Sequence, residues 1–204
     1  MKNVENIHNG KIYIPMDEEI LKDQLKKIDL LKEYNNSDAS NQELRLKLLK
    51  NMLGDMGKDC YIEAPFYANF GGRNVHLGNH VYANFHLTCV DDTNIYIGDD
   101  TMIGPNVTIV TATHPVSPTL RKKGYQYNKE VHIGKNCFIG AGSIILPGVN
   151  IGDNSIIGAG SLVNKDVPSG VIVVGNPARI LRKINENDEI YYDHDKLIDW
   201  EEIE

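Results

Sequence analysis

The sequence predicts a β protein whose main part, residues 61–184, is a parallel β-helix of six-residue repeats. Aliphatic residues recur six apart in two blocks, at Ile97, Ile103 and Ile109 and then at Ile133, Ile139, Ile145, Ile151, Ile157 and Val163. In the second block the next residue is usually glycine, as at Gly134, Gly140, Gly152 and Gly158. Six residues make one short strand and a corner, and three such units return the chain above itself. The aliphatic side chains are therefore expected to fill a triangular interior.

Residues 1–60 precede the repeats, and the spacing of their apolar residues predicts two helices. The first covers residues 17–34, with Asp17 as its N-cap. Its apolar stripe consists of Ile20, Leu21, Leu25, Ile28 and Leu31. The second is expected over residues 41–53, with Ser40 opening a capping box. These helices form a small N-terminal addition to the repeat domain.

The six-residue register is interrupted twice, and interruptions of a repeat scaffold are where function is usually found. Two extra residues separate Cys89 from Ile97, which predicts a bulge over residues 91–94. A longer interruption, over about residues 113–130, contains prolines, tyrosines and basic residues and is expected to leave the coil as a loop. Residues 185–204 form an acidic tail, which is expected to be a loosely packed helix.

Composition narrows the classes of partner. The 204 residues carry a formal net charge of -7, which argues against nucleic acid and anionic membranes as partners because both require a basic face. No apolar run is long enough to cross a bilayer and the N-terminus has no secretory signal, so a cytoplasmic location is expected. Three scattered cysteines suit core thiols rather than disulfides or a zinc site.

His114 is the residue best placed to act as a general base. It opens the longer interruption, and Pro115 restricts its backbone to extended conformations. Imidazole titrates near neutral pH, as a general base requires. By contrast, His80 and His86 are one repeat apart, so they are expected on successive faces of the coil, and no metal site is predicted.

Two polar residues and a basic group accompany His114. Asp92 lies in the predicted bulge, and Asn84 occupies a position where the second block usually has glycine or alanine. Near the C-terminal end of the coil, basic side chains follow two runs of small residues, Gly140–Gly142 and Gly158–Gly160. These basic residues are Lys165, Arg179, Arg182 and Lys183. Together they predict a groove for an extended, phosphate-bearing ligand.

Several segments together resemble the maltose and galactoside O-acetyltransferases over residues 9–184. They are NGKIY, ANFHLTCVDDTNIYIGDDTMIGPNVTI, TATHP, the Ile-Gly repeats and the closing GNPARI. The resemblance implies a left-handed parallel β-helix assembled as a homotrimer. It also implies an enzyme that moves the acetyl group of acetyl-CoA to a hydroxyl of a small acceptor, most simply a sugar of the maltose, glucose or galactoside kind.

The resemblance also implies roles for individual residues. His114 matches the catalytic base, Asn84 matches a residue that stabilises the transition state and contacts the acetyl donor, and Asp92 matches an acceptor-binding carboxylate. The positions that match the acetyl-CoA site are Ala141, Ala159, Asn164, Lys165, Arg179 and Arg182.

The acceptor site departs from the family pattern in two places. Where the family has an acidic residue after the NGKIY segment, this chain has Ile-Pro-Met, and Asp17 is displaced. Phe70 stands where a galactoside enzyme has a small polar residue. Asp17 and Phe70 are therefore the expected acceptor-binding positions that set this chain apart. Two alternatives stay open: a related acetyltransferase acting on an antibiotic or other hydroxyl compound, and a non-catalytic β-helix that binds or assembles.

Overall fold

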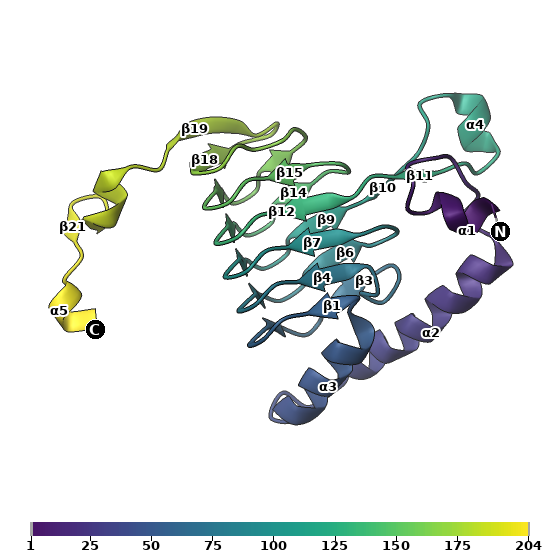
Figure 1. The fold of residues 1–204 in the computed structure, drawn as a ribbon, viewed down its shortest axis with the longest axis horizontal. Helices are drawn as coiled ribbons and strands as arrows, with labels where there is room; N and C mark the ends of the chain where they lie inside the picture. Colours follow the sequence, from purple (N-terminus) through teal and green to yellow (C-terminus); the bar gives the residue numbers. More distant parts are fainter. Residues whose placement is uncertain (1, 204) are drawn as a thin grey trace.

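The computed structural model describes residues 2–203 and shows three-sided coils stacked into a prism (Figure 1). Three parallel sheets form its sides, and we call them face 1, face 2 and face 3 in the order in which the chain visits them. Face 1 contains β1 (Asp55–Met56), β4 (Val75–Leu77), β7 (Ile95–Ile97), β12 (Val131–Ile133) and β15 (Asn150–Ile151). Face 2 contains β2 (Tyr61–Ile62), β5 (Tyr82–Ala83), β8 (Met102–Ile103), β13 (Phe138–Ile139), β16 (Ile156–Ile157), β18 (Val171–Val174) and the antiparallel β19 (Arg179–Lys183). Face 3 contains β3 (Tyr67–Ala68), β6 (Thr88–Val90), β9 (Thr108–Val110), β14 (Ile144–Ile145) and β17 (Leu162–Val163).

The interior of the prism is filled by the side chains that the six-residue period selects. All nine aliphatic residues of the two blocks are 3% exposed or less. The three cysteines, Cys60, Cys89 and Cys137, are buried free thiols in the same core. The predicted aliphatic interior and the predicted core thiols are therefore both confirmed. The physical reason is that alternate residues of a strand point to opposite sides, and only one side faces the interior.

Where glycine follows the aliphatic residue, the neighbouring coil leaves no room for a side chain. A Cβ on Gly140 would lie 2.5 Å from the backbone nitrogen of Ala159, one coil further along. A Cβ on Gly98 would lie 2.7 Å from the carbonyl carbon of Gly134. The crowding is therefore between stacked coils, and glycine allows their backbones to approach at the corners.

Helices cover the first coil and one side of the prism. A short α1 (Lys2–Asn6) begins the chain, and α2 (Glu18–Asn35) starts at the predicted N-cap Asp17. Leu25 of the predicted stripe is 62% exposed, so α2 buries a narrower face than expected. In α3 (Gln42–Met52) the N-cap is Asn41, whose side chain accepts from the N–H of Leu44. The prediction of Ser40 as this cap is wrong, because its hydroxyl donates to Asp38 instead.

Both interruptions of the repeat lie at the same edge of the prism, where face 3 passes to face 1. We call this edge the 3–1 corner. Residues 91–94 connect β6 to β7 there, and residues 111–130 connect β9 to β12 in the next coil. One coil earlier, residues 69–74 cross the same corner between β3 and β4. Three successive coils thus carry irregular backbone at one edge.

The longer interruption has secondary structure of its own. Strands β10 (Ala112–Thr113) and β11 (Tyr127–Asn128) pair antiparallel, and α4 (Pro118–Lys122) lies between them. Figure 1 shows this segment projecting from the prism beside α1. We call residues 111–130 the protruding arm.

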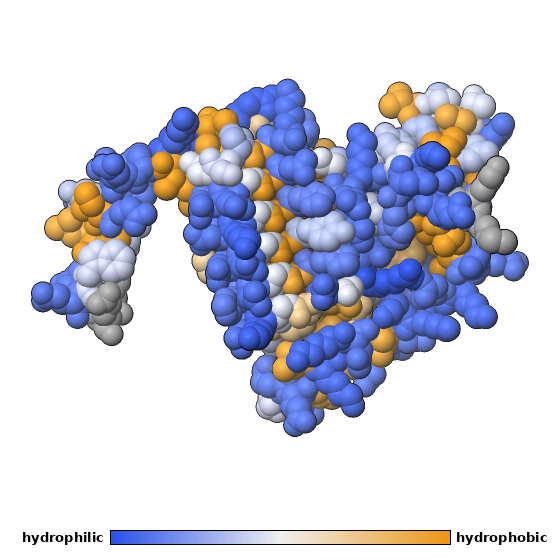
Figure 2. Space-filling view, in the orientation of Figure 1, coloured by the Kyte–Doolittle hydropathy of each residue, from blue (hydrophilic) through white to orange (hydrophobic). Residues whose placement is uncertain are grey.

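The acidic tail is not a helix, so that expectation is wrong. It contains a 3-10 turn, η1 (Glu186–Glu189), a hairpin of β20 (Tyr191–Asp193) with β21 (Lys196–Leu197), and only a short α5 (Trp200–Ile203). His194 has a positive φ of 49°, a turn conformation that interrupts helical backbone. In Figure 1 the tail leaves the end of the prism and hangs away from the coils, and Figure 2 shows apolar side chains exposed on it.

Among the described residues, no helix combines the length and apolar character needed to cross a membrane.

Candidate active site

His114 follows β10 at the 3–1 corner and lies at the base of the protruding arm. Its Nδ1 is 2.9 Å from the carbonyl oxygen of Tyr125, on the returning limb of the arm. A carbonyl oxygen can only accept, so Nδ1 carries the proton and Nε2 keeps its lone pair. The imidazole is exposed to solvent. The arm thus presents one ring nitrogen outward as a base.

Asp92 lies one coil before His114 at the same corner, and its carboxylate is buried at 4% exposure. One oxygen accepts from Nε2 of Gln126 in the protruding arm at 2.7 Å. The other accepts from Nδ2 of Asn69, one coil earlier, at 2.7 Å. Asp92 therefore ties three successive crossings of the corner together.

The NGKIY segment holds the same network from outside the prism. Tyr13 pairs with Gln126 through two backbone hydrogen bonds of 2.9 and 3.0 Å. Its buried hydroxyl accepts from Nε2 of Gln126 at 2.7 Å and from Nδ2 of Asn128 at 3.0 Å. Burial raises the pKa of Tyr13 to about 12, so the phenol stays neutral at physiological pH. This segment therefore braces the arm that carries His114.

Asp91, next to Asp92, shapes the preceding crossing. Its buried carboxylate accepts from the backbone N–H groups of Phe70, Gly72 and Asn74 at 2.6, 3.1 and 3.4 Å. Burial raises the pKa of Asp91 to about 7, although the hydrogen bonds from Phe70 and Asn74 oppose the rise. The carboxylate fixes the loop over residues 69–74 and so places Asn69 beside Asp92.

Asn69 belongs to the hydrogen-bond network of Asp92, and the sequence did not indicate it. Its side chain is the one in this segment that contacts Asp92, and the residue is exposed. Phe70, the predicted position, is 5% exposed and packs in a cluster with Ile7, Tyr13 and Ile20. The alternation of sides along β3 could have indicated this: Ala68 lies on the inner side, so the next residue, Asn69, points outward.

Asp17 has a structural role in the chain. Its carboxylate caps α2 through the N–H of Glu19 at 3.0 Å and accepts from Nδ2 of Asn3 at 3.1 Å. The hydrogen bond from Asn3, and then that from Glu19, lower the pKa of Asp17. No hydrogen bond joins it to Asp92 or His114 among residues 2–203, so its predicted contact with the acceptor stays a prediction.

Asn84, Ala141 and Ala159 lie along a different edge, where face 2 passes to face 3. We call this edge the 2–3 corner. Asn84 follows β5, and its side-chain oxygen accepts from the N–H of Phe85 at 2.7 Å. Its Nδ2 donates to no described group. Ala141 and Ala159 are exposed on the two later coils, and their N–H groups also lack acceptors within the described part of the chain. This corner offers a line of free donors.

Three of the predicted donor-site residues meet at the C-terminal end of the prism. Asn164, Lys165 and Arg179 line one cavity of about 190 Å³. Arg182 lies further along β19, and its guanidinium forms an ion pair with Asp188 of the tail at 2.6 Å. The basic residues of the predicted groove thus lie on the last coil and on β19, and their binding of a phosphate-bearing ligand stays a prediction.

The predicted catalytic residues do not converge within a single chain. His114 and Asp92 lie at the 3–1 corner, whereas Asn84, Ala141 and Ala159 lie at the 2–3 corner. The strands of face 3 separate the two edges. A single copy therefore holds the base and the line of free donors on different edges of the prism.

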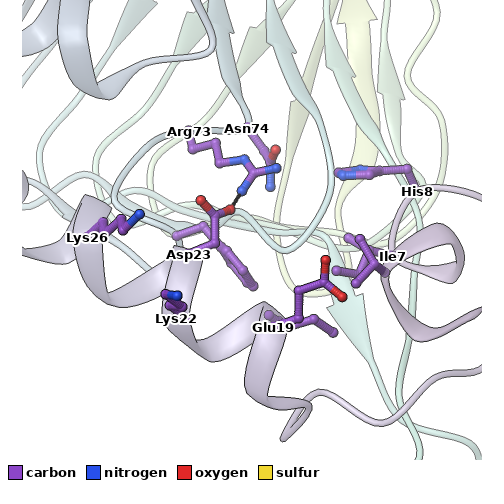
Figure 3. Close-up of a pocket in the computed structure, with 11 residues that line it drawn as sticks. Ile7, His8, Glu19, Lys22, Asp23, Lys26, Arg73 and Asn74 are labelled. Atoms are coloured by element: carbon purple, nitrogen blue, oxygen red, sulfur yellow. Dashed lines mark ion pairs between the residues drawn. The ribbon is translucent and has the colours of Figure 1, made fainter. Parts of the chain in front are cut away.

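A separate cavity of about 440 Å³ lies between α2, the N-terminal segment and residues 70–74 (Figure 3). Figure 3 shows Arg73 and Asp23 joined as an ion pair, with Lys22, Lys26, Glu19 and His8 around them. Burial, followed by the charge of Arg73, lowers the pKa of His8. Of the predicted site residues, only Phe70 lines this cavity.

Four further histidines lie on the outer side of the coils. Nδ1 of His80 lies 3.0 Å from Asp100, and His86 stacks on Tyr67 at the next corner. His76 and His132 stack on either side of Tyr96 on face 1. Within the part of the chain that the structure describes, no three His, Cys, Asp or Glu side chains are close enough to hold an ion.

Known proteins resemble this chain along almost its whole length. Residues 6–57 match the maltose acetyltransferase hexapeptide capping motif, and residues 130–165 match the hexapeptide repeat of succinyl-transferase. The galactoside O-acetyltransferase of Lactococcus lactis is 52% identical over 203 residues, which cover 100% of this chain and 98% of that protein.

Two solved structures also match. A galactoside acetyltransferase in complex with coenzyme A has a TM-score of 0.94 and 43% identity, covering 98% of this chain and 99% of its own. A hexapeptide-repeat acetyltransferase of Vibrio cholerae complexed with acetyl coenzyme A has a TM-score of 0.84 and 31% identity, covering 91% of this chain and 100% of its own. The resemblance seen in the sequence is confirmed, and the chain belongs to the family of the maltose and galactoside O-acetyltransferases, enzymes built on hexapeptide repeats.

Proposed function

We propose that this enzyme transfers the acetyl group of acetyl-CoA to a hydroxyl group of a sugar, with His114 as the general base. The observation that carries the proposal is the hydrogen bond between Nδ1 of His114 and the carbonyl of Tyr125, which leaves Nε2 able to accept a proton. The likeness to acetyltransferases bound to coenzyme A and acetyl coenzyme A supports the choice of donor. The galactoside O-acetyltransferase name of the Lactococcus relative supports a sugar as acceptor.

The reaction needs one proton carrier and no covalent enzyme intermediate. Nε2 of His114 takes the proton of the acceptor hydroxyl as the oxygen attacks the thioester carbonyl carbon. A tetrahedral intermediate forms, with negative charge on the former carbonyl oxygen. When it collapses, the bond from carbon to sulfur breaks, and His114 returns the proton to the departing thiolate. The products are the acetylated acceptor and free CoA.

The free donors of the 2–3 corner suit the negative oxygen of that intermediate. Nδ2 of Asn84 and the N–H of Ala141 each lack an acceptor within the described chain. A fixed donor aimed at a developing oxyanion is worth about 2.7 to 4 kcal/mol. Because the side chain of Asn84 is held by its bond to the N–H of Phe85, little reorganisation is needed.

The proposal requires two copies of the chain at each site. His114 and Asn84 lie on different edges of one prism, so they meet only where the 3–1 corner of one copy faces the 2–3 corner of another. Each copy has one edge of each kind, and such head-to-tail contacts close into a ring, of which a homotrimer is one case. The outer side of face 2 supports an interface, since Tyr82, Met102 and Phe138 are aligned there and 37 to 51% exposed.

The test of the proposed reaction is the release of free thiol from acetyl-CoA. Wild-type protein is expected to release thiol only when a hydroxylated acceptor is present, and mass spectrometry should find the acceptor heavier by one acetyl group. A panel of glucose, maltose, galactosides and non-sugar alcohols ranks the acceptors by kcat/KM. Absence of thiol release with the whole panel would contradict the proposal and favour a binding module.

The donor site gives a second prediction. Arg179→Ala is expected to raise the KM for acetyl-CoA by about ten-fold or more, because a charge-assisted hydrogen bond to a phosphate contributes about 1.5–3 kcal/mol. The KM for the acceptor should change less, since Arg179 lies at the end of the prism with Asn164 and Lys165. Lys47→Ala is the matched control, because Lys47 is an exposed cation on α3 at the other end. Equal changes in both KM values would contradict the assignment.

A further inference from the structure

Arg182 is held by the acidic tail through a two-point contact. Nη1 donates to Oδ2 of Asp188 at 2.7 Å, and Nη2 donates to Oδ1 at 2.6 Å. Nη1 also donates to the carbonyl oxygen of Lys183 at 3.0 Å. Planar two-point pairs of this kind fix the direction of a guanidinium as well as its place.

These contacts use only one end of the guanidinium. The group has five N–H donors, and the contacts with Asp188 and Lys183 engage both on Nη1 and one on Nη2. The Nε–H and the second N–H of Nη2 have no acceptor among residues 2–203. These two donors lie side by side along one edge of the plane, an arrangement that matches two oxygens of a phosphate.

Asp188 is itself fixed before any ligand arrives. Its Oδ2 accepts from the N–H of Asn185 at 2.8 Å, and the Asn185 side chain completes a capping box on η1. The hydrogen bond from Arg182 and then that from Asn185 lower the pKa of Asp188 to about 2, so its charge is present throughout the physiological range. A short, capped turn therefore holds a carboxylate opposite the arginine.

Arg182 lies on the same side of β19 as Arg179, which lines the cavity at the end of the prism. Arg182 pairs with Ile172 and Arg179 pairs with Val174, and paired residues of neighbouring strands share a side of the sheet. Ile172 and Val174 lie on the outer side of face 2, because the alternate residues Val171 and Val173 are buried. Both arginines therefore lie on the outer side of face 2 at the end of the prism.

We propose that Asp188 is a positioning residue of the donor site: it holds Arg182 by one end so that the free edge of the guanidinium faces a phosphate of acetyl-CoA. The proposal rests on the proposed function, because it needs Arg182 to bind the donor. It gives the acidic tail a role in a basic site. A carboxylate that merely added negative charge there would weaken the binding of phosphate, so its removal would strengthen the binding of CoA. If Asp188 positions Arg182, its removal weakens the binding of CoA instead.

Asp188→Asn separates these roles because it removes the charge and one acceptor but keeps an oxygen for the N–H of Asn185. A positioning role predicts that the KM for acetyl-CoA and the Kd for CoA, measured by calorimetry without turnover, rise about three- to ten-fold while kcat changes little. An unchanged or lower Kd for CoA would overturn the proposal. Glu186→Gln is the matched control, since Glu186 loses the same charge in the same turn and has no contact with Arg182.

A double-mutant cycle tests whether Asp188 acts through Arg182. In an Arg182→Ala background, Asp188→Asn should have no further effect on the Kd for CoA, whereas an effect as large as in the wild type would overturn the proposal. Failure of the proposed function would look different. In that case wild-type protein itself would bind no CoA and release no thiol, whereas failure of this inference alone leaves the wild-type values intact and Asp188→Asn without effect.

Discussion

His114→Ala is expected to lower kcat by about 10²- to 10⁴-fold, the range typical of a lost general base. A hydroxyl proton is held too tightly to ionise at neutral pH, so without Nε2 the attacking oxygen must lose its proton to water. The Kd for CoA should stay within about two-fold of the wild-type value because the predicted donor residues lie on other parts of the prism. The imidazole is exposed, so the melting temperature should hardly change.

The control for this prediction is His132→Ala, another exposed histidine, which stacks on Tyr96 on face 1. It should keep nearly wild-type kcat. Activity of His114→Ala close to wild type, with acetyl-CoA and the preferred acceptor, would contradict the assignment of the base.

Mixing two inactive variants tests whether the site is shared between copies. In assemblies of His114→Ala alone every site lacks the base, and in assemblies of Asn84→Ala alone every site lacks the asparagine. In mixed head-to-tail rings assembled from equal amounts, about a quarter of the sites should combine an intact His114 with an intact Asn84. Activity should therefore reappear after the two proteins are unfolded and refolded together, and not after they are refolded apart. No recovery in the mixture would contradict a shared site.

The fold could be predicted because its rule is local and repeated. A position such as Ile139 is buried for the same reason as Ile145 and Ile151, so each repeat tests the same hypothesis again. The tail had no such repetition. Its few apolar residues fit a helix on spacing alone, and the turn at His194 that makes a hairpin has no distinctive sequence.

The site could be predicted only in part, because the period gives each residue a place along the coil but not a neighbour across coils. The interruptions located Asp92 and His114 correctly at irregular backbone. The sequence did not indicate that both interruptions share one corner, or that Gln126 reaches back to Asp92 at 2.7 Å. Asn69 was missed for the same reason: it contacts Asp92 only because two coils are stacked.

In the proposed reaction, the interruptions and the regular coils supply different groups at two edges of the prism. At the 3–1 corner, extra residues supply side chains, among them His114, Asp92 and Asn69. At the 2–3 corner, the unbroken repeat supplies backbone: glycines such as Gly140 let the coils approach closely, and the N–H of Ala141 has no acceptor among residues 2–203. A transferase needs both, since the base must move a proton while fixed dipoles hold the charge that develops.

Asp92→Asn is expected to lower kcat/KM for the acceptor by about 10- to 100-fold, while the KM for acetyl-CoA stays the same. Both oxygens of Asp92 accept from amide N–H groups, one from Asn69 and one from Gln126. An asparagine has one oxygen and one NH₂, so one of these two amides would face another donor. Gln126 is held by Tyr13, so the exposed Asn69 is the side chain that must turn away.

A local effect of Asp92→Asn on the acceptor is distinguished from a loss of structure by two further measurements and a control variant. Asp92 is buried, so the Kd for CoA and the melting temperature are recorded on the same sample, and an unchanged Kd shows that the prism is intact. Asp153→Asn is the matched control, because Asp153 accepts from a backbone N–H between face 1 and face 2, away from the 3–1 corner. If Asp92→Asn kept the wild-type kcat/KM for the acceptor, the assignment of Asp92 to the acceptor site would be contradicted. A selective loss would instead place the acceptor at the 3–1 corner, where Asp92 joins three crossings of the chain. His114 lies at the same corner, in the next coil, where the protruding arm begins.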